Sequence, residues 1–426
     1  MLEAQQRRAS YAKSSGMSSG ARFAAQGYGS STFWQSWFNT VNALVGVGIL
    51  ALPLALAYAG WVAGIGLFLL SGLLTNYTGK LLARIMAQEP SVRTYADIGA
   101  YAFGARARLV VSAFFCLELW AVATALVILF GDSTHALVQA AARAGHGTLG
   151  LEAWAPAGFK ALGLAIVLPS VFLPLRFLSP ISVVGIVSII TLFSVVLSDG
   201  IVKREAPGSL WQPAPTSAWP DWQKVPLSFG LIMSGFSAHP IIPSLNKDLK
   251  DPRHFPLMLD LAYVAATAIY LSMGVVGYLL FGRHVSSEIT QDLSRTPGYP
   301  AVLNKIAIWM IVVSALSKFA LAVRPINTTV ELLFGPPAPD ADGSTTPVAR
   351  AEDVNPLAGS AISLRAGAAT AAWAPRSRAA VRAALRIAIA ALVGLTAIVL
   401  PGFEKVMAFL GAFLAFSTCV FGPVIA

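Results

Sequence analysis

The chain has 426 residues, of which 56% are hydrophobic and only 12% charged, and its formal net charge is +10. A soluble protein carries about a quarter charged residues, so this composition excludes an ordinary soluble domain. The apolar runs are continuous and about 20 residues long, which favours membrane-spanning helices over the alternating strands of a barrel. Basic residues flank these runs and indicate topology and contact with the lipid bilayer, with no nucleic-acid partner.

The chain shows no pattern typical of an enzyme. Its two cysteines, Cys116 and Cys419, each fall inside an apolar run and predict neither a disulfide framework nor a metal site. The five histidines show no ligand spacing. Neither a phosphate-binding loop nor a nucleophile–base pair can be read from the chain. We therefore expect no catalytic residue, no metal and no cofactor.

Taken in order, residues 1–32 are polar and basic and predict a disordered cytosolic tail. The remainder, 33–426, predicts one transmembrane domain. Residues 334–378 are rich in Ala, Pro, Gly and Ser without apolar periodicity, which predicts a disordered cytosolic loop. Ten spans are predicted, at 34–59, 61–86, 108–131, 159–175, 179–200, 225–245, 256–281, 301–323, 381–401 and 404–426.

The distribution of basic residues predicts the orientation of the chain. Of the 30 Lys and Arg residues, 20 fall in the N-terminal tail and the loops on the same side of the predicted spans, and 9 fall on the other side. The remaining one, Lys318, lies inside a span. Because cytoplasmic loops carry an excess of Lys and Arg, this asymmetry predicts a cytosolic N-terminus.

Two of the predicted spans are interrupted, one at the start of each half of the chain. Gly loosens a helix, and Pro removes a backbone donor. In lipid, the freed backbone groups survive only where they face protein or a water-filled cavity. Two such spans are typical of a secondary transporter with a substrate site near the bilayer midplane, although glycines can also be packing notches. The interrupting residues are Gly46, Gly48, Pro53, Gly235, His239, Pro240 and Pro243.

Several ionisable residues fall within or at the ends of the predicted spans. Because an acid within a span is costly, Glu118 is expected to be either a functional acid or a neutral, hydrogen-bonded structural one. Lys318 could occupy the place of a sodium ion, relay a proton, or extend its ammonium to the interface. His239 could sense pH or be satisfied structurally. Asp132 and Asp199 lie at span ends, where we expect them to be solvated.

Particular segments, in their order and spacing, resemble the amino acid/auxin permease family. The likeness covers about 34–331 and 381–420 and is strongest with the fungal and plant vacuolar amino acid transporters, which also resemble the vesicular inhibitory amino acid transporters. The segments are FNTVNALVGVGILALPLALAYAGW, TNYTGKLLARIM, TYADIGAYAFG, CLELWAVATALVILFGDS, GFSAHPIIPSLNKDLKDPRHFP, GYLLFG, ALSKFALAVRP and LPGFEKVMAFLGAF.

The resemblance implies an all-α polytopic fold with a LeuT-like 5+5 inverted repeat. Repeat one would span 34–200 and repeat two 225–426, with helices 1 and 6 broken around a central site. Eukaryotic members usually have eleven helices, so an eleventh is expected to be missing from this chain. That expectation leaves open whether the chain transports by itself.

The resemblance also implies secondary active transport of neutral amino acids into an acidic vacuole, in exchange for protons, with the proton gradient as energy source. The partners would be the amino acid, protons and the bilayer, and we expect no obligate protein partner. Backbone groups at the interruptions would bind the substrate zwitterion. The expected substrate-binding residues are Asn42, Gly46, Val47, Gly48, Leu50, Ser234, Gly235 and Phe236. The expected candidates for proton coupling are Glu118, Lys318 and His239.

Two alternatives remain open from the sequence. One is a proton symporter that exports amino acids from the vacuole or imports them at the plasma membrane. The other is a non-transporting amino acid sensor, in which the tail or the 334–378 loop would bind a signalling partner.

Overall fold

The computed structural model describes residues 29–89, 92, 94–145, 147–172, 181–334, 375–400 and 402–426. The predicted tail lies outside these residues as far as position 28, and the predicted loop does so over 335–374. The described residues are helical or irregular apart from one isolated parallel bridge, between Ser31 and Leu249. This bridge ties the chain before the first helix to the loop at 249–250, since Lys250 N donates to Ser31 O at 3.0 Å.

Both predicted interruptions are present. The first lies between α3 (Phe33–Leu44) and the short η1 (Val47–Ala51), which leads into α4 (Leu52–Gln88). The second separates α10 (Val225–Gly235) from η4 (His239–Ile241), which leads into α11 (Ile242–Asp248). The expected fold class, all-helical with broken first and sixth helices, is therefore confirmed.

Eight of the described helices are long and apolar enough to cross a membrane. The longest, Val47–Gln88, has 42 residues and would extend over roughly 60 Å if straight, about twice the hydrocarbon thickness of a bilayer. It folds back at Gly60, where φ is 66°, and so provides two of the predicted crossings. Pro156–Phe172 is a shorter apolar helix. These two features account for the difference from the ten predicted spans.

The fold-back requires glycine at position 60. A Cβ at Gly60 would lie 2.6 Å from the carbonyl oxygen of Trp219, and the positive φ strains any other L-residue. After the turn, Trp61 N donates to Ser217 O at 3.1 Å, so the loop satisfies a backbone donor at the start of the returning helix. The boundary between the first two spans is thus set by one turn residue and one loop.

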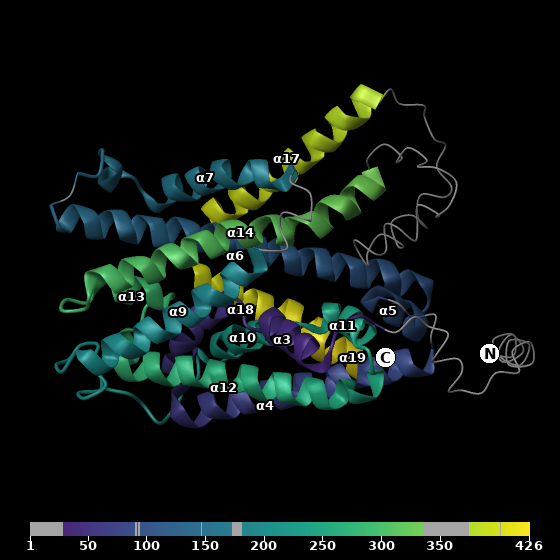
Figure 1. Cartoon of the computed structure of the whole chain (residues 1–426), viewed down its shortest axis with the longest axis horizontal. Helices are drawn as coiled ribbons and strands as arrows, with labels where there is room; N and C mark the ends of the chain where they lie inside the picture. Colours follow the sequence, from purple (N-terminus) through teal and green to yellow (C-terminus); the bar gives the residue numbers. More distant parts are fainter. Residues whose placement is uncertain are drawn as a thin grey trace, which may run out of the picture.

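The long helices form two groups, seen on opposite sides of Figure 1. In the first group, α4 packs along α12, and α12 and α4 also contact α3 and α10, respectively. In the second group, α6 packs along α14, and α7 and α17 contact both α6 and each other. The bounds of the helices introduced here are α12 (Phe255–Phe281), α6 (Ala105–Arg143), α14 (Ala301–Phe334), α7 (Pro156–Val167) and α17 (Pro375–Val399).

The remaining helices connect these groups. The helix α9 (Ile181–Val202) packs on α14 and α12, and α18 (Phe403–Phe409) with η7 (Leu410–Ala415) packs on α10 and α6. The last span is π-helical over η7 and η8, a widened form of helix often found at functional sites. The short elements are α5 (Tyr95–Phe103), η2 (Leu151–Ala153), η3 (Leu168–Phe172), η5 (Pro252–His254), η6 (Gly282–His284), α13 (Ile289–Arg295), η8 (Ser417–Phe421) and α19 (Gly422–Ile425).

Several helix boundaries differ from the prediction. The third span was expected to end at 131, but α6 continues to Arg143. The eighth span was expected to end at 323, before Arg324-Pro325, but α14 continues through Pro325 to Phe334. The extension is held by tertiary contact, because Arg386 of α17 donates to Glu331 at 2.5 Å. The helix α17 itself begins at Pro375, inside the segment expected to be a loop. Packing between the two extensions outweighs the local cost of proline and of the polar sequence.

Candidate functional site

The interruption in the first span lies at Val45 and Gly46. The helix α3 closes with Val45 N donating to Val41 O at 2.7 Å, and Gly46 then adopts an extended conformation (φ −104°, ψ −165°). The next turn begins with Ile49 N donating to Gly46 O at 3.4 Å. The N–H groups at the start of such a turn have no partner within the helix itself.

The interruption in the sixth span lies at residues 236–238. The helix α10 ends at Gly235, and Ala238 N donates to Phe236 O at 3.1 Å instead of continuing the helical ladder. The chain resumes a helical path at His239, followed by Pro240. The helical ladder ends here in a tighter turn, in which Phe236 N donates to Met233 O at 3.0 Å.

The two interruptions face one another. A Cβ placed on Gly48 would lie 3.5 Å from the Ser234 hydroxyl oxygen and 3.9 Å from Gly235 Cα. The same position would be 3.2 Å from the terminal methyl carbon of Met407 in α18. The three helices meet here at van der Waals distance only because residue 48 has no side chain. The first break thus packs directly against the end of α10, just before the second break.

Tyr270 of α12 joins the two breaks through its hydroxyl group. The oxygen lies 2.5 Å from Leu44 O, at the end of α3, and 2.7 Å from Gly235 O, at the end of α10. A tyrosine hydroxyl has one proton and donates to one of these carbonyls at a time. The ring also fills the space beside Gly235, where a Cβ would lie 3.0 Å from it. Sequence reasoning missed this residue, although a tyrosine within an apolar span was an available signal.

Glu118 reaches the sixth-span break from α6. It is 5% exposed, and its carboxyl group accepts hydrogen bonds from Ser237 in the break and from Thr418 in η8, the latter at 3.3 Å. Tyr95 of α5 donates to the backbone carbonyl of Thr418. The structure thus brings one of the predicted coupling residues directly to the break and connects it to the last span.

His239 is fully buried behind the same break. Its Nε2 lies 2.8 Å from the Thr78 hydroxyl oxygen in α4. The Thr78 hydroxyl also lies within donating distance of Leu74 O at 3.0 Å. The imidazole thus ties α4 to the second half of the broken span.

Lys318 lies where α14 crosses α9. A Cβ on Gly185 would lie 2.5 Å from its Cε and 2.9 Å from its Nζ, so the glycine makes room for the side chain. Among the described residues, no carboxylate lies within ion-pair distance of this ammonium. Lys318 is therefore a partly buried cation between two helices.

The other residues expected to bind substrate have different surroundings. Gly46 has open space beside it, since an added Cβ would meet only Leu44 O, at 3.9 Å. Val47 and Leu50 are buried. Phe236 is fully buried and packs edge-on against Tyr270 with ring centroids 5.2 Å apart. Asn42 is half-buried on the last turn of α3.

The two acids expected to be solvated differ from that expectation. Asp199 is 1% exposed on α9, and Asp132 is partly buried on α6. Both lie within helices whose neighbours cover them, which the position of a residue near the end of an apolar run does not reveal.

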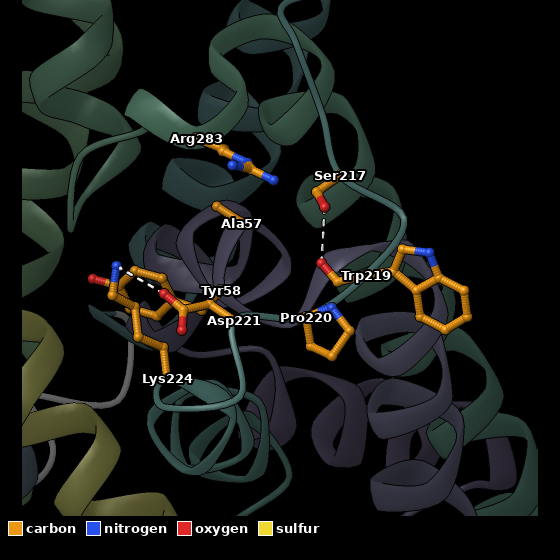
Figure 2. A pocket seen from close by; sticks show the side chains of 8 residues that line it. All are labelled: Ala57, Tyr58, Ser217, Trp219, Pro220, Asp221, Lys224 and Arg283. Atoms are coloured by element: carbon orange, nitrogen blue, oxygen red, sulfur yellow. Dashed lines mark hydrogen bonds and ion pairs between the residues drawn. The ribbon is translucent and has the colours of Figure 1, made fainter.

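A cavity of about 400 Å³ lies at the end of the molecule that carries the loop before α10 (Figure 2). It opens beside the fold-back of α4, and its charged lining includes an ion pair between Lys224 and Asp221 at 3.3 Å. The lining residues are Ala57, Tyr58, Ser217, Trp219, Pro220, Asp221, Lys224 and Arg283.

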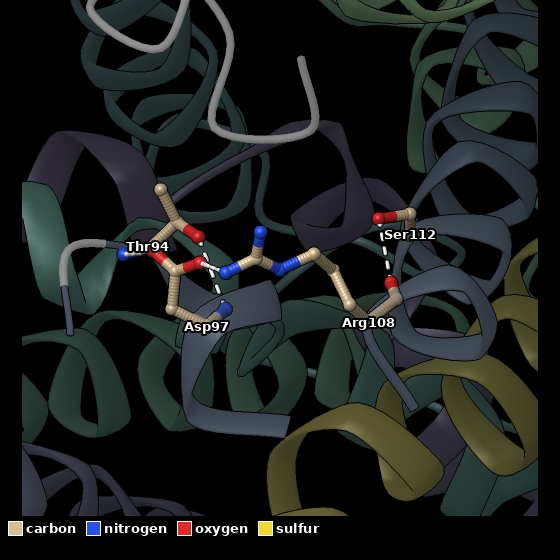
Figure 3. Close-up of polar contacts among 4 residues, drawn as sticks. All are labelled: Thr94, Asp97, Arg108 and Ser112. Carbon is tan, nitrogen blue, oxygen red and sulfur yellow. Dashed lines mark hydrogen bonds and ion pairs between the residues drawn. The ribbon is translucent and has the colours of Figure 1, made fainter. Parts of the chain in front are cut away.

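A polar cluster joins α5 to the start of α6 (Figure 3). Thr94 and Asp97 form a capping box at the start of α5, and Arg108 of α6 forms an ion pair with Asp97. The Ser112 hydroxyl donates to Arg108 O at 2.8 Å. This cluster fixes the short helix that carries Tyr95, and hence the position of its contact with the last span.

A comparison with protein families identifies the chain. The family model described as "Transmembrane amino acid transporter protein" matches residues 29–426. The chain belongs to this family. The match includes both breaks and every helix described above.

The chain is similar to three named amino acid transporters and to one solved structure. Amino acid transporter AVT1J from Arabidopsis thaliana is 34% identical over 74% of this chain and 72% of the relative. Amino acid transporter AVT1D from the same plant is 32% identical over 71% of this chain and 53% of the relative. The vesicular inhibitory amino acid transporter of Xenopus laevis is 24% identical over 71% of this chain and 56% of the relative. The crystal structure of MhsT in complex with L-phenylalanine matches with a TM-score of 0.47 and 13% identity, over 93% of this chain and 88% of that one.

Proposed function

We propose that the protein is a secondary active transporter of neutral amino acids across the vacuolar membrane, which exchanges the amino acid for protons. The observation that carries this proposal is the meeting of the two broken spans at Gly48 and Ser234, with Glu118 bonded to the second break. Membership of the amino acid transporter family supports the substrate class. The vacuolar location rests on the resemblance described in the sequence analysis.

The chemistry of the two breaks suits a zwitterion. The N–H groups of Val47 and Gly48, at the start of η1, would bind the α-carboxylate, because the positive end of a helical dipole favours an anion. Carbonyl groups at the end of α10 would accept from the α-ammonium. The neighbouring Met407 and Phe236 side chains are apolar and would favour a substrate without a side-chain charge.

The two helix groups provide the parts for alternating access. The broken spans belong to the group with α4 and α12, whereas Glu118 belongs to the group with α6 and α14. The bond between Glu118 and Ser237 crosses from one group to the other. Protonation of the carboxyl group would change that bond and so bias the two arrangements, because a ligand shifts populations only by its differential affinity. Glu118 is therefore the first candidate for coupling, ahead of His239 and Lys318.

The test is uptake of labelled neutral amino acids into isolated vacuoles bearing this chain, with and without ATP-driven acidification. Uptake that needs an acidic lumen and is abolished by a protonophore is the expected result. Efflux of the amino acid driven by the same gradient would contradict antiport and show that the protein is a symporter that exports amino acids from the vacuole. Substrate binding without flux in either direction would contradict transport and point to a sensor.

Coupling is tested separately with variants of the three candidates. In Glu118→Gln, exchange of labelled amino acid across the membrane should persist while uptake against a gradient is lost, because the amide keeps hydrogen bonding but cannot release a proton. Lys318→Ala should keep the dependence of uptake on lumenal pH. If Glu118→Gln kept uptake against a gradient and Lys318→Ala lost its dependence on lumenal pH, Lys318 and not Glu118 would be the coupling residue.

A further inference from the structure

Glu288 is a buried acid outside the spans that the transport scheme above does not use. It directly precedes α13, in the segment between α12 and α14, and its side chain is 0% exposed. Neither carboxyl oxygen has a hydrogen-bond partner of ordinary geometry among the described residues, although the Gln291 side chain is close enough to influence it. An ionised carboxylate in such a place costs several kcal/mol, so the neutral acid is favoured. Burial accordingly raises the pKa of Glu288 well above its usual range.

The charges that face Glu288 do not remove this cost. Asp132 of α6 and Glu404 of α18 act on it as like charges, and Lys160 of α7 is the single opposite charge acting on it among the described residues. Lys160 also faces Asp132, and its ammonium donates to Ala397 O at 3.2 Å. The ammonium of Lys160 is thus shared between the Glu288 and Asp132 carboxyl groups, which favours protonation of the more buried one.

The surroundings of α13 place this acid next to the broken first span. The helix packs on α6, α14 and η1. Ile289, the residue after Glu288, is fully buried, and its Cδ1 would lie 2.9 Å from a Cβ on Gly277 of α12. The same Cβ would lie 2.4 Å from Pro53 Cγ, at the start of α4. Ile289, Gly277 and Pro53 therefore meet, and α13 is seated on the second half of the broken span.

We propose that Glu288 is a proton-binding site that latches α13 onto the broken first span. With a proton bound, the neutral acid remains in its buried place and α13 stays seated. When the proton leaves, the carboxylate needs water, and α13 separates from η1 and Pro53 to admit it. The site takes a proton and no larger ligand.

The role of this latch in a transport cycle rests on the proposed function. The basic-residue count predicts that the segment between α12 and α14 lies on the face opposite the cytosol. An acidic lumen would then seat α13 and close that face after the amino acid has been released. The latch would thereby favour return of the transporter to its cytosol-facing state.

The test measures the accessibility of α13 in the purified full chain in nanodiscs. Leu293, which is 2% exposed on α13, is replaced in L293C after both native cysteines have been changed to alanine. Labelling by a membrane-impermeant maleimide is followed from pH 5 to pH 8. Dividing its rate by that of A144C, at an exposed position after α6, removes the intrinsic pH dependence of thiol reactivity. The normalised rate should rise about tenfold per pH unit over the titration, as release of one proton requires.

Two variants locate the response. In Glu288→Gln, labelling of L293C should stay low at every pH, because the amide imitates the protonated acid. Asp292→Asn is the matched control on the same helix and should keep the rise. A normalised rate that does not depend on pH in the otherwise unmodified chain would overturn the latch. So would a rise that persists in Glu288→Gln, or high labelling of that variant at every pH. Because the assay needs neither substrate nor gradient, its failure is distinct from failure of the proposed transport.

Discussion

The Glu118 carboxyl group on α6 accepts a hydrogen bond from the Ser237 hydroxyl, which lies in the break between α10 and η4. The two residues belong to different helix groups and are 119 positions apart in the chain. The contact therefore joins a buried ionisable group to the backbone that is proposed to bind the substrate. Its energy depends on the protonation state of the acid, because a hydrogen bond to a charged group is stronger than one to a neutral group.

Ser237→Ala should lower uptake at saturating gradient by about tenfold, since it removes one hydrogen bond to a buried acid at a cost of about 1.5 kcal/mol or more. The measurement is the initial rate of amino acid uptake in vacuoles. Ser272→Ala is the matched control, because the exposed Ser272 hydroxyl donates only to a carbonyl of its own helix. Equal rates for the two variants would contradict a functional role for the Glu118–Ser237 contact.

Tyr270→Phe should weaken both substrate binding and thermal stability. The change removes the hydroxyl that lies between Leu44 O and Gly235 O and leaves a buried carbonyl without a donor, at a cost of about 1–3 kcal/mol. Tyr263→Phe is the control, because the Tyr263 hydroxyl has no hydrogen-bond partner of ordinary geometry among the described residues. Binding of a labelled amino acid and the unfolding temperature in detergent are measured for both. We expect Tyr263→Phe to match the unmodified chain, and a Tyr270→Phe variant that did the same would refute the bridging role.

Gly48→Leu should abolish detectable substrate binding. The new side chain would enter the space between Met407, Ser234 and Gly235, where even a Cβ comes within 3.2 Å of its nearest neighbour. Overpacking of this kind costs about 1–3 kcal/mol and would separate the two breaks. Gly66→Leu serves as the control, because nothing lies within 4 Å of a Cβ at Gly66. Unchanged binding in Gly48→Leu would show that the substrate lies elsewhere.

Gly60→Ala should prevent stable folding of the first two spans. The added Cβ would lie 2.6 Å from Trp219 O, in addition to the cost of a positive φ of 66°. Gly145→Ala separates the steric clash from the cost of the positive φ. Its φ is also positive, at 73°, but nothing lies within 4 Å of the added Cβ. The conformational term alone is about 1–2 kcal/mol. The yield of monodisperse protein after extraction should fall sharply for Gly60→Ala and little for Gly145→Ala.

Because of Asp292, the free energy of unfolding should fall as the pH rises from about 4 to about 6. Burial raises the pKa of its carboxyl group to about 6, against the opposing effect of hydrogen bonds from Ser286. Because the ordinary value is about 3.9, the folded state binds more protons than the unfolded state within this window. The stabilisation that Asp292 gives the folded state is complete below its unfolded pKa of about 3.9 and is lost above its folded pKa of about 6. The full difference corresponds to about 3 kcal/mol.

The measurement for this prediction is the apparent unfolding temperature in detergent at pH 4, 5, 6 and 7, for the unmodified chain and for Asp292→Asn. The difference between the two curves isolates this carboxyl group from other titrating residues. It should change between pH 4 and pH 6 and level off above that. A constant difference would mean that Asp292 keeps an ordinary pKa in the folded protein.

The sequence by itself determined that this is a helical membrane protein with interrupted first and sixth spans. Both results follow from local chemistry. Continuous apolar runs have no stable position in water, and the chain around Gly46 and Gly235 cannot sustain an unbroken ladder in an apolar environment. The same local reasoning selected Glu118, because a carboxyl group inside a span is costly wherever its partners lie.

Only the tertiary structure decided which groups meet. Ser237, Thr418 and Tyr270 reach the breaks from segments far apart in the chain, and no periodicity relates their positions. The burial of Asp199 and the end of α14 beyond Pro325 likewise depend on neighbouring helices. Side-chain contacts between helices are set by how their surfaces interlock, which a one-dimensional pattern of apolar residues leaves open.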